Sequence, residues 1–235
     1  ALAMGQSGVV DIDTSAGSVD GQDGFGVIGA AIGPGGSVDI TTGNVSGALG
    51  GVLGLNTSGD THVTVNGLVS VESGGFIGVG AIAAGGGDAT VDFSGVIDPP
   101  LIGAGALTLG SGTATVNTAG LIDADLIGVI AVNIGTGHAA VNNSADVFSS
   151  SGTTPILGVG AAKIGNNSAT GAQDVIVSNS GDVSDYAVGV LGLAIGDGND
   201  VLVQNSGTVE DGFLGVGGAV IGNGAGGSLV VSNTG

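Results

Sequence analysis

The sequence has no cysteine, no tryptophan and a single tyrosine, Tyr186, and only four of its 235 residues are proline. Without cysteine no disulfide can stabilise the chain, so its stability has to come from packing. The scarcity of aromatic side chains predicts a thin, aliphatic core. It also leaves Tyr186 as the one candidate for the exposed aromatic platform on which sugar-binding sites usually depend.

Positive charge is almost absent as well. Lys163 is the one basic side chain against twenty acidic ones, and the formal net charge is −19. Nucleic acid and anionic membrane surfaces are therefore excluded as partners, since binding them requires clustered lysine and arginine. Divalent cations and cationic surfaces are the natural counterparts of such a chain, although acidic residues also serve simply to solvate a surface.

One uncharged stretch, residues 101–122, has the length of a membrane-spanning helix but not the composition. It is interrupted by five glycines together with serine and threonine, which argues against insertion into a membrane. The first residues lack the basic segment that opens a signal peptide.

What the sequence does contain is a repeat. Glycine is the commonest residue, with 53 copies, and the segments between glycines are rich in valine, isoleucine and threonine. A small residue followed by any residue and then Val or Ile returns about every 26 residues, which is typical of a stacked solenoid. The copies begin at Gly17, Gly43, Gly67, Gly95, Gly120, Ala145, Gly181 and Gly207.

Two further columns align with this phrase. One is an apolar run around a glycine, such as Leu126-Ile127-Gly128-Val129, and the other is a short Val-x-Val segment, such as Val201-Leu202-Val203. The sequence therefore predicts an all-β, single-domain parallel β-helix over residues 1–235, with eight to nine coils of three short strands each. Coils spaced by about 4.8 Å would give a rod on the order of 40 Å long.

Like residues should then stack on like. We expect Phe25, Phe76 and Phe213 to share the same buried column of the stack. The corner asparagines should lie in register and bond to one another along the stack, as a structural ladder with no catalytic role. They are Asn143, Asn179, Asn205 and Asn233.

The sixth coil departs from the period, with a step of 36 residues between Ala145 and Gly181. Its surplus lies in residues 149–155 and 166–174, within the long coil at about residues 145–180. Insertions in a solenoid form surface loops, where binding sites are most often found, so this coil is the candidate location for a ligand site.

Two segments, Asn179-Ser180-Gly181-Asp182-Val183 and Asn205-Ser206-Gly207-Thr208-Val209, each follow a Val-x-Val strand. They resemble the Asn-Ser-Gly-Thr-Ile units of autotransporter passenger domains and related haemagglutinin-like secreted bacterial proteins. The resemblance implies a right-handed parallel β-helix that is secreted or displayed on a bacterial cell surface, in an adhesive or structural role. It also implies a passenger segment or a separately secreted unit.

A second resemblance concerns calcium. Residues 196–202, Gly-Asp-Gly-Asn-Asp-Val-Leu, are similar to the core of calcium-binding nonapeptide repeats, although the nine-residue period is absent here. Acidic turns after the Gly-x-Val phrase offer further carboxylates that should repel across coils or recruit a divalent ion. The candidate calcium ligands are Asp197, Asp200, Asp123, Asp125, Glu210 and Asp211.

No catalytic constellation stands out. A polysaccharide lyase on this fold would need arginine or lysine, and Lys163 lies in an apolar run from which we expect it to point outward. Among so many carboxylates no single pair suggests a hydrolase. His62 and His138 are about three repeats apart and are interpreted as surface residues rather than one metal site.

These observations favour a non-enzymatic extracellular solenoid that works by repetition and self-association. Both ends cut through the repeat without a polar cap, so the expected partners are further coils of a longer chain or a second copy stacked end to end, with a host surface or glycan as a further partner. The alternative is a carbohydrate-active or glycan-binding β-helix with its site on the long sixth coil.

Overall fold

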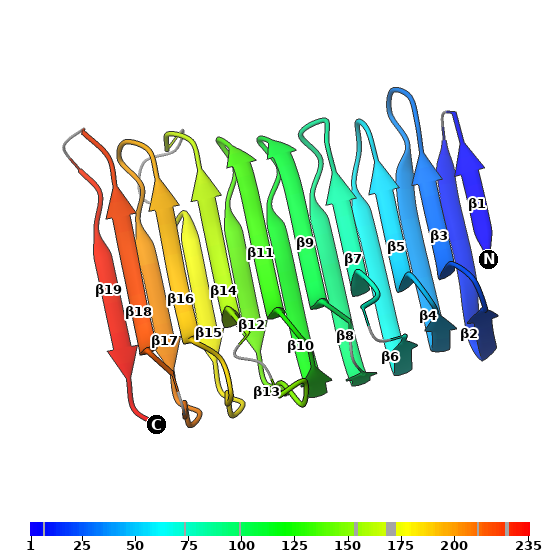
Figure 1. Cartoon of the computed structure of the whole chain (residues 1–235). Coiled ribbons are helices and arrows are strands. Elements are labelled where there is room, and N and C mark those ends of the chain that lie inside the picture. The colour runs from blue at the N-terminus through cyan, green and yellow to red at the C-terminus, as the bar shows by residue number, and fades with distance from the viewer. Residues whose placement is uncertain are drawn as a thin grey trace.

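A computed structural model describes residues 1–6, 8–72, 74–98, 100–152, 155–167, 173–210, 212–223 and 226–235. Every regular element in these residues is a β-strand, and the strands form a parallel β-solenoid of about eight turns spaced by about 26 residues. The predicted fold is confirmed. The two ends of the chain lie at opposite ends of the stack (Figure 1).

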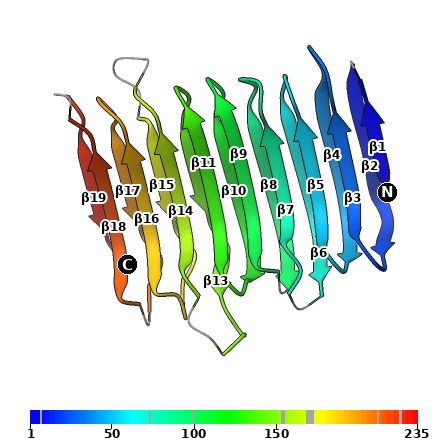
Figure 2. The ribbon, with the colours of Figure 1, turned by 45° about the horizontal axis from the view of Figure 1, so that its top comes forward.

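Each turn contributes one strand to each of two parallel sheets, which lie one behind the other along the whole stack (Figure 2). Sheet A has nine strands and sheet B ten. Sheet A contains β1 (Leu2–Gly5), β3 (Phe25–Ala31), β5 (Gly50–Asn56), β7 (Ile77–Ala83), β9 (Ile102–Gly110), β11 (Ile127–Gly135), β14 (Leu157–Ile164), β16 (Val188–Ile195) and β18 (Leu214–Ile221). Sheet B contains β2 (Val9–Gly21), β4 (Ser37–Gly47), β6 (Thr61–Val71), β8 (Ala89–Asp98), β10 (Ala114–Asp123), β12 (Ala139–Asn143), β13 (Asp146–Phe148), β15 (Val175–Asn179), β17 (Val201–Asn205) and β19 (Leu229–Asn233).

The core lies between the inner faces of the two sheets and is built from stacked columns of valine and alanine. In sheet A, Val79, Ala104 and Val129 succeed one another in register and are fully buried. In sheet B, Val116 and Val141 do the same. Because each buried side chain meets a similar one in the next coil, the sequence period translates directly into packing.

The third predicted strand of each coil exists only in part. From β2 to β10 the Val-x-Val and Gly-x-Val segments run together into single strands of 10 to 13 residues. Later the Gly-x-Val segment is reduced to the three-residue β13 and to isolated bridges that join Val147, Val183 and Val209.

The glycines that close the sheet A strands are required by close backbone contacts between coils. Gly165 has a φ of 145°, and a Cβ atom added there would lie 2.1 Å from the carbonyl oxygen of Gly135. Gly135 is related in the same way to Gly110. The recurring aliphatic-glycine pair of the sequence is thus a steric requirement of stacking rather than a binding motif.

The predicted phenylalanine column is wrong. Phe76 and Phe213 are 66% and 97% exposed, because they precede the sheet A strands and point away from the core. Phe25 lies one position further along, inside β3 and paired with Gly50, over which its ring packs. The inner columns of sheet A accept valine and alanine, so these phenylalanines fall at the margin of that sheet, whereas Phe93 is buried in an inner column of sheet B, in register with Val65 and Thr118.

The outer faces of the two sheets differ sharply. The outward side chains of sheet A are aliphatic or absent, as at Val132 and Gly105. Sheet B presents polar side chains over most of its outer face, among them His62, Asp92 and Asn117.

Candidate functional site

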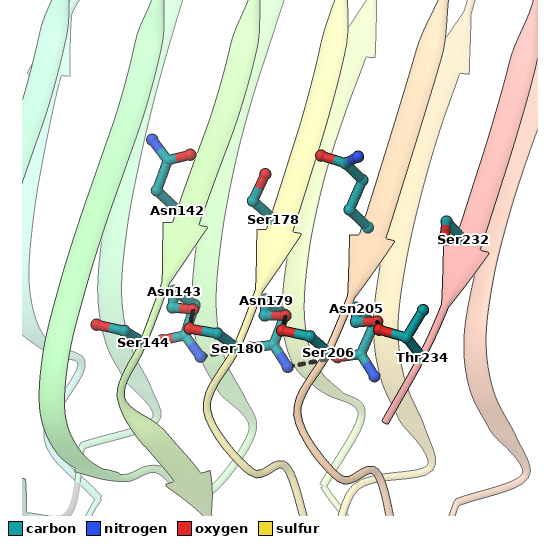
Figure 3. A pocket seen from close by; sticks show the side chains of 11 residues that line it. Asn142, Asn143, Ser144, Ser178, Asn179, Ser180, Asn205, Ser206, Ser232 and Thr234 are labelled. Atoms are coloured by element: carbon teal, nitrogen blue, oxygen red, sulfur yellow. Dashed lines mark hydrogen bonds between the residues drawn. The ribbon is translucent and has the colours of Figure 1, made fainter.

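A groove of about 540 Å³ runs along the ends of the sheet B strands (Figure 3). We call it the polar groove. It runs across four successive coils, from the residues just before the long sixth coil to β19. Its lining is formed by Asn142, Asn143, Ser144, Ser178, Asn179, Ser180, Gln204, Asn205, Ser206, Ser232 and Thr234.

The floor of the polar groove is the predicted asparagine ladder, which the structure confirms. The Nδ2 atom of Asn143 donates to Oδ1 of Asn179 at 2.6 Å, and Asn179 donates in the same way to Asn205. Asn205 continues the ladder to Asn233 at 2.7 Å. Each of the first three amides also donates to the carbonyl oxygen two residues on. The buried amides are thereby paired, and the corners of these four coils are joined to one another.

Above this floor the groove presents only neutral hydrogen-bonding groups. Asn142 and Gln204 are exposed, Ser178 lies between them at the same register position, and a second row of hydroxyls comes from Ser180 and Ser206. No titratable side chain lines the groove. It can therefore hydrogen-bond a polar, uncharged ligand along the stack, but it offers neither a nucleophile nor a general base.

The aspartates have a structural use that the sequence analysis missed. A carboxylate in one turn repeatedly accepts a backbone N–H of the next coil, at distances of 2.7 to 3.0 Å, where the strand ladder is interrupted. The carboxylates in all of these contacts belong to aspartate, whose short side chain stays close to the turn that carries it. The pairs join Asp60 to Asp88, Asp88 to Thr113, Asp146 to Asp182, Asp182 to Thr208, Asp174 to Asp200, Asp197 to Asn223, and Asp200 to Ser228.

Two of the predicted calcium ligands, Asp197 and Asp200, belong to this set. Asp197 Oδ1 accepts the Asn223 N–H, and Asp200 Oδ1 accepts both the N–H and the hydroxyl of Ser228. Their carboxylates are therefore already engaged in joining the coils. The resemblance of residues 196–202 to a calcium-binding repeat has this alternative structural explanation.

Asp123 and Asp125 lie in the turn that leads from β10 to β11. Asp123 is buried and accepts the N–H and the hydroxyl of Ser150 at 2.9 and 2.5 Å. Burial raises the pKa of Asp125, and the nearby carboxylates of Asp123 and Asp98 raise it further. The predicted repulsion between acidic side chains is present here, and a cation bound in this turn would relieve it.

The other predicted ligands are more dispersed. Glu210 is exposed in the turn before β18, and its N–H donates to the Val183 carbonyl oxygen. Asp211 lies outside the described residues. Within the described part of the chain, no three His, Asp or Glu side chains are grouped so as to hold a metal ion. Calcium binding by this set stays a prediction.

Lys163 was expected to point outward, and this expectation is wrong. Its side chain is completely buried inside the solenoid, where Nζ contacts Oδ1 of the equally buried Asp174. Asp174 precedes β15, and its Oδ2 accepts the Asp200 N–H at 2.9 Å. The surplus residues of the sixth coil place this carboxylate beneath Lys163, so the pair joins the end of a sheet A strand to the start of a sheet B strand.

The two histidines lie far apart in the sequence, as predicted, and both contact carboxylates. His62 is half exposed on the outer face of sheet B, with Nε2 2.7 Å from Asp92 Oδ2. His138 is less exposed, and its Nδ1 lies 3.8 Å from Asp174 Oδ1. Tyr186 is 1% exposed and donates its hydroxyl to the carbonyl oxygens of Ala124 and Phe148. The one tyrosine is thus a core residue and no platform for a sugar ring.

Comparison with known proteins gives no relative. No family model, no curated protein and no solved structure matches the chain. The described residues also contain no helix of the length and apolar character needed to cross a membrane.

Proposed function

We propose that this chain is a non-enzymatic extracellular or cell-surface solenoid with a structural or adhesive role, which continues end to end into a longer rod. The observation that carries the proposal is the state of the terminal coil. All residues of β19 are exposed, and Val231 is 42% exposed although its equivalent in β17, Val203, is fully buried. A further coil would cover exactly such residues with the same column packing that operates between all the others, whether it comes from the same polypeptide or from another copy.

The first coil, at the other end of the stack, also has exposed apolar side chains. Leu2, Met4 and Val9 of the first coil are each at least 64% exposed. Both sheets end there in strands with one unpaired edge, which readily pair with another strand. Secretion and the bacterial cell surface are part of the proposal and rest on the resemblance to autotransporter passengers.

Electron microscopy of the purified chain tests the end-to-end stacking. We expect rods whose lengths are multiples of one unit, and we expect Val231→Asp to shorten them by blocking the β19 edge. Thr115→Asp, on the outer face of sheet B, is the matched control and should leave the lengths unchanged. A wild-type chain that is strictly monomeric at all concentrations would contradict the proposal for this chain.

The polar groove favours a second candidate function, the binding of a neutral glycan. Its stacked hydroxyls and amides repeat from coil to coil, include residues at both ends of the long sixth coil and can pair with sugar hydroxyls. The buried position of Tyr186 counts against this function. A glycan array should then give a signal that Asn142→Ala with Gln204→Ala removes, because both side chains are exposed and outside the ladder. No signal from the wild type, or one that the double variant retains, would contradict it.

A further inference from the structure

The outer face of sheet A carries no polar or charged side chain. Polar residues do occur in its strands, but Asn56, Thr108, Asn133 and Lys163 are all buried on the inner side. The outward residues form columns in register along the stack. We call them the aliphatic face, which comprises Ile77, Ile102, Ile127, Leu157, Val188 and Leu214; Leu53, Gly80, Gly105, Ile130, Gly160, Leu191 and Gly217; Leu55, Ile82, Leu107, Val132, Ala162, Leu193 and Ala219; and Leu109, Ile134, Ile164, Ile195 and Ile221.

The glycines in this face make it flat. A Cβ atom at Gly80 would meet the Ile77 side chain at 2.8 Å and that of Leu53 at 3.1 Å, so these side chains lie across the space that the glycine leaves. Leu157 lies over Gly160 in the same way, at 2.8 Å. Neighbouring side chains thus fill the hollows at these positions, which leaves a level, closely packed apolar surface.

The face is also large. Its columns run over the seven strands from β5 to β18, which at about 4.8 Å per strand and about seven residues of about 3.3 Å each span on the order of 800 Å². Its margin is well exposed, with Ile134 and Ile164 both at 45% and Ile221 at 57%. Soluble monomers rarely expose an apolar patch above about 600 Å², whereas one side of a stable protein interface covers about 800 Å².

The residues around the aliphatic face indicate whether a lipid surface or a second copy of the chain covers it. Proteins that sit on lipid surfaces use tryptophan, tyrosine and basic side chains at the margin of the apolar face. This chain has no tryptophan, its tyrosine and its lysine are buried, and its net charge of −19 opposes anionic headgroups. A second copy of the same face needs no tryptophan, tyrosine or basic side chain at its margin, and apposing two uncharged faces buries no unpaired charge.

We propose that two copies of this chain pack laterally, with the aliphatic face of one on that of the other. The two sheets would lie about 10 Å apart with their strands within about 30° of each other, as in a β-sandwich. This contact is independent of end-to-end stacking, since it uses the side of the rod and not its ends. The acidic residues that the structure describes lie in the turns and in sheet B, so added salt should strengthen the pairing by screening repulsion between the two copies.

The test is sedimentation equilibrium of the full chain, with Val231→Asp in every sample to suppress end-to-end growth. We expect a dimer. Ile134→Glu with Ile164→Glu should weaken it by about 100-fold, because four carboxylates would enter the interface. Thr90→Glu with Thr115→Glu adds the same charges one coil apart on the outer face of sheet B and should leave the dimer intact. Circular dichroism and the thermal midpoint should show that both variants fold, since the replaced side chains are outward.

Three results would overturn the proposal. The first is a parent that remains monomeric at about 100 μM, where even weak pairing is detected. The second is a dimer that survives the Ile134 and Ile164 substitutions. The third is a monomeric parent that floats with phosphatidylcholine vesicles and loses this property in the same variant, which would assign the face to a lipid surface.

Discussion

The two sheets are built by the same coils and share one core, yet the outer face of sheet B is mostly polar and the outer face of sheet A is aliphatic. Sheet B satisfies its outer side chains within the sheet: Asn117 donates to Asp92 and accepts from Asn142, each at 2.7 to 2.8 Å. Sheet A offers aliphatic side chains that nothing in the described chain covers. The difference shows that the sequence contains more apolar side chains than its core holds, and that the remaining ones lie together on the outer face of sheet A.

The largest expected effect concerns Lys163, the single charge that breaks the apolar character of the sheet A strands. Lys163→Met would leave the buried Asp174 carboxylate without its partner, so we expect a loss of about 3–5 kcal/mol in the free energy of unfolding, measured with urea. Lys163→Met with Asp174→Asn removes both charges and should recover most of that loss. An unchanged urea midpoint for the single variant would show that the pair does not stabilise the fold.

The second comparison is between the two sides of one sheet A strand, β9. A Cβ atom on inward Gly103 would lie 2.5 Å from the Gly128 carbonyl oxygen and 2.5 Å from Ile122 Cγ2, whereas one on outward Gly105 would meet nothing closer than 3.5 Å. Gly103→Ala should therefore cost about 3 kcal/mol by overpacking. Gly105→Ala should be neutral or slightly stabilising. Equal thermal midpoints for the two variants would contradict the assignment of inner and outer faces.

The third prediction sets the inner side of sheet B against its outer side. Asn179→Ala removes a buried amide that donates to Gly181 and Asn205 and accepts from Asn143, so we expect a loss of about 2 kcal/mol in urea unfolding. Asn142→Ala removes an exposed amide with one side-chain partner and should change stability by less than about 0.5 kcal/mol. If the asparagine ladder does not stabilise the fold, both variants would show similarly small changes in the free energy of unfolding.

The smallest effect is expected in the turn that joins the sheets at Asp125. Its pKa is raised, so the ionised carboxylate destabilises the fold above that pKa, and the penalty disappears as the pH falls towards the unfolded-state value. Asp125→Asn should slightly raise the thermal midpoint at neutral pH and flatten its rise on mild acidification. A midpoint that falls in the variant would mean that the carboxylate is stabilising.

The same turn tests calcium. If calcium binds there, the ion should raise the wild-type thermal midpoint more than that of Asp125→Asn, because the variant lacks both the repulsion and the ligand. An unchanged wild-type midpoint with calcium and with chelator would contradict calcium binding by the predicted ligands.

The sequence by itself determined the stack. Coils in a solenoid touch only their neighbours, so the period of Gly-x-Val, the Val-x-Val segments and the corner asparagines predict the columns that the structure contains. The resemblance to autotransporter passengers agrees with this fold, and its functional implications stay predictions. The polar groove follows from the same ladder, since the residues that flank each asparagine repeat with it.

Only the tertiary structure decided which way particular side chains point. The sheet A strands are apolar on both sides, so alternation cannot tell Val129, in the core, from Ile130, on the surface. The burial of Lys163 depended on Asp174, eleven residues further along the chain, and no local period encodes that distance. The repeat in the sequence determines the contacts between equivalent residues of successive coils. Contacts between non-equivalent residues depend on the path of each coil in three dimensions, and so does the choice of the face that is turned to solvent.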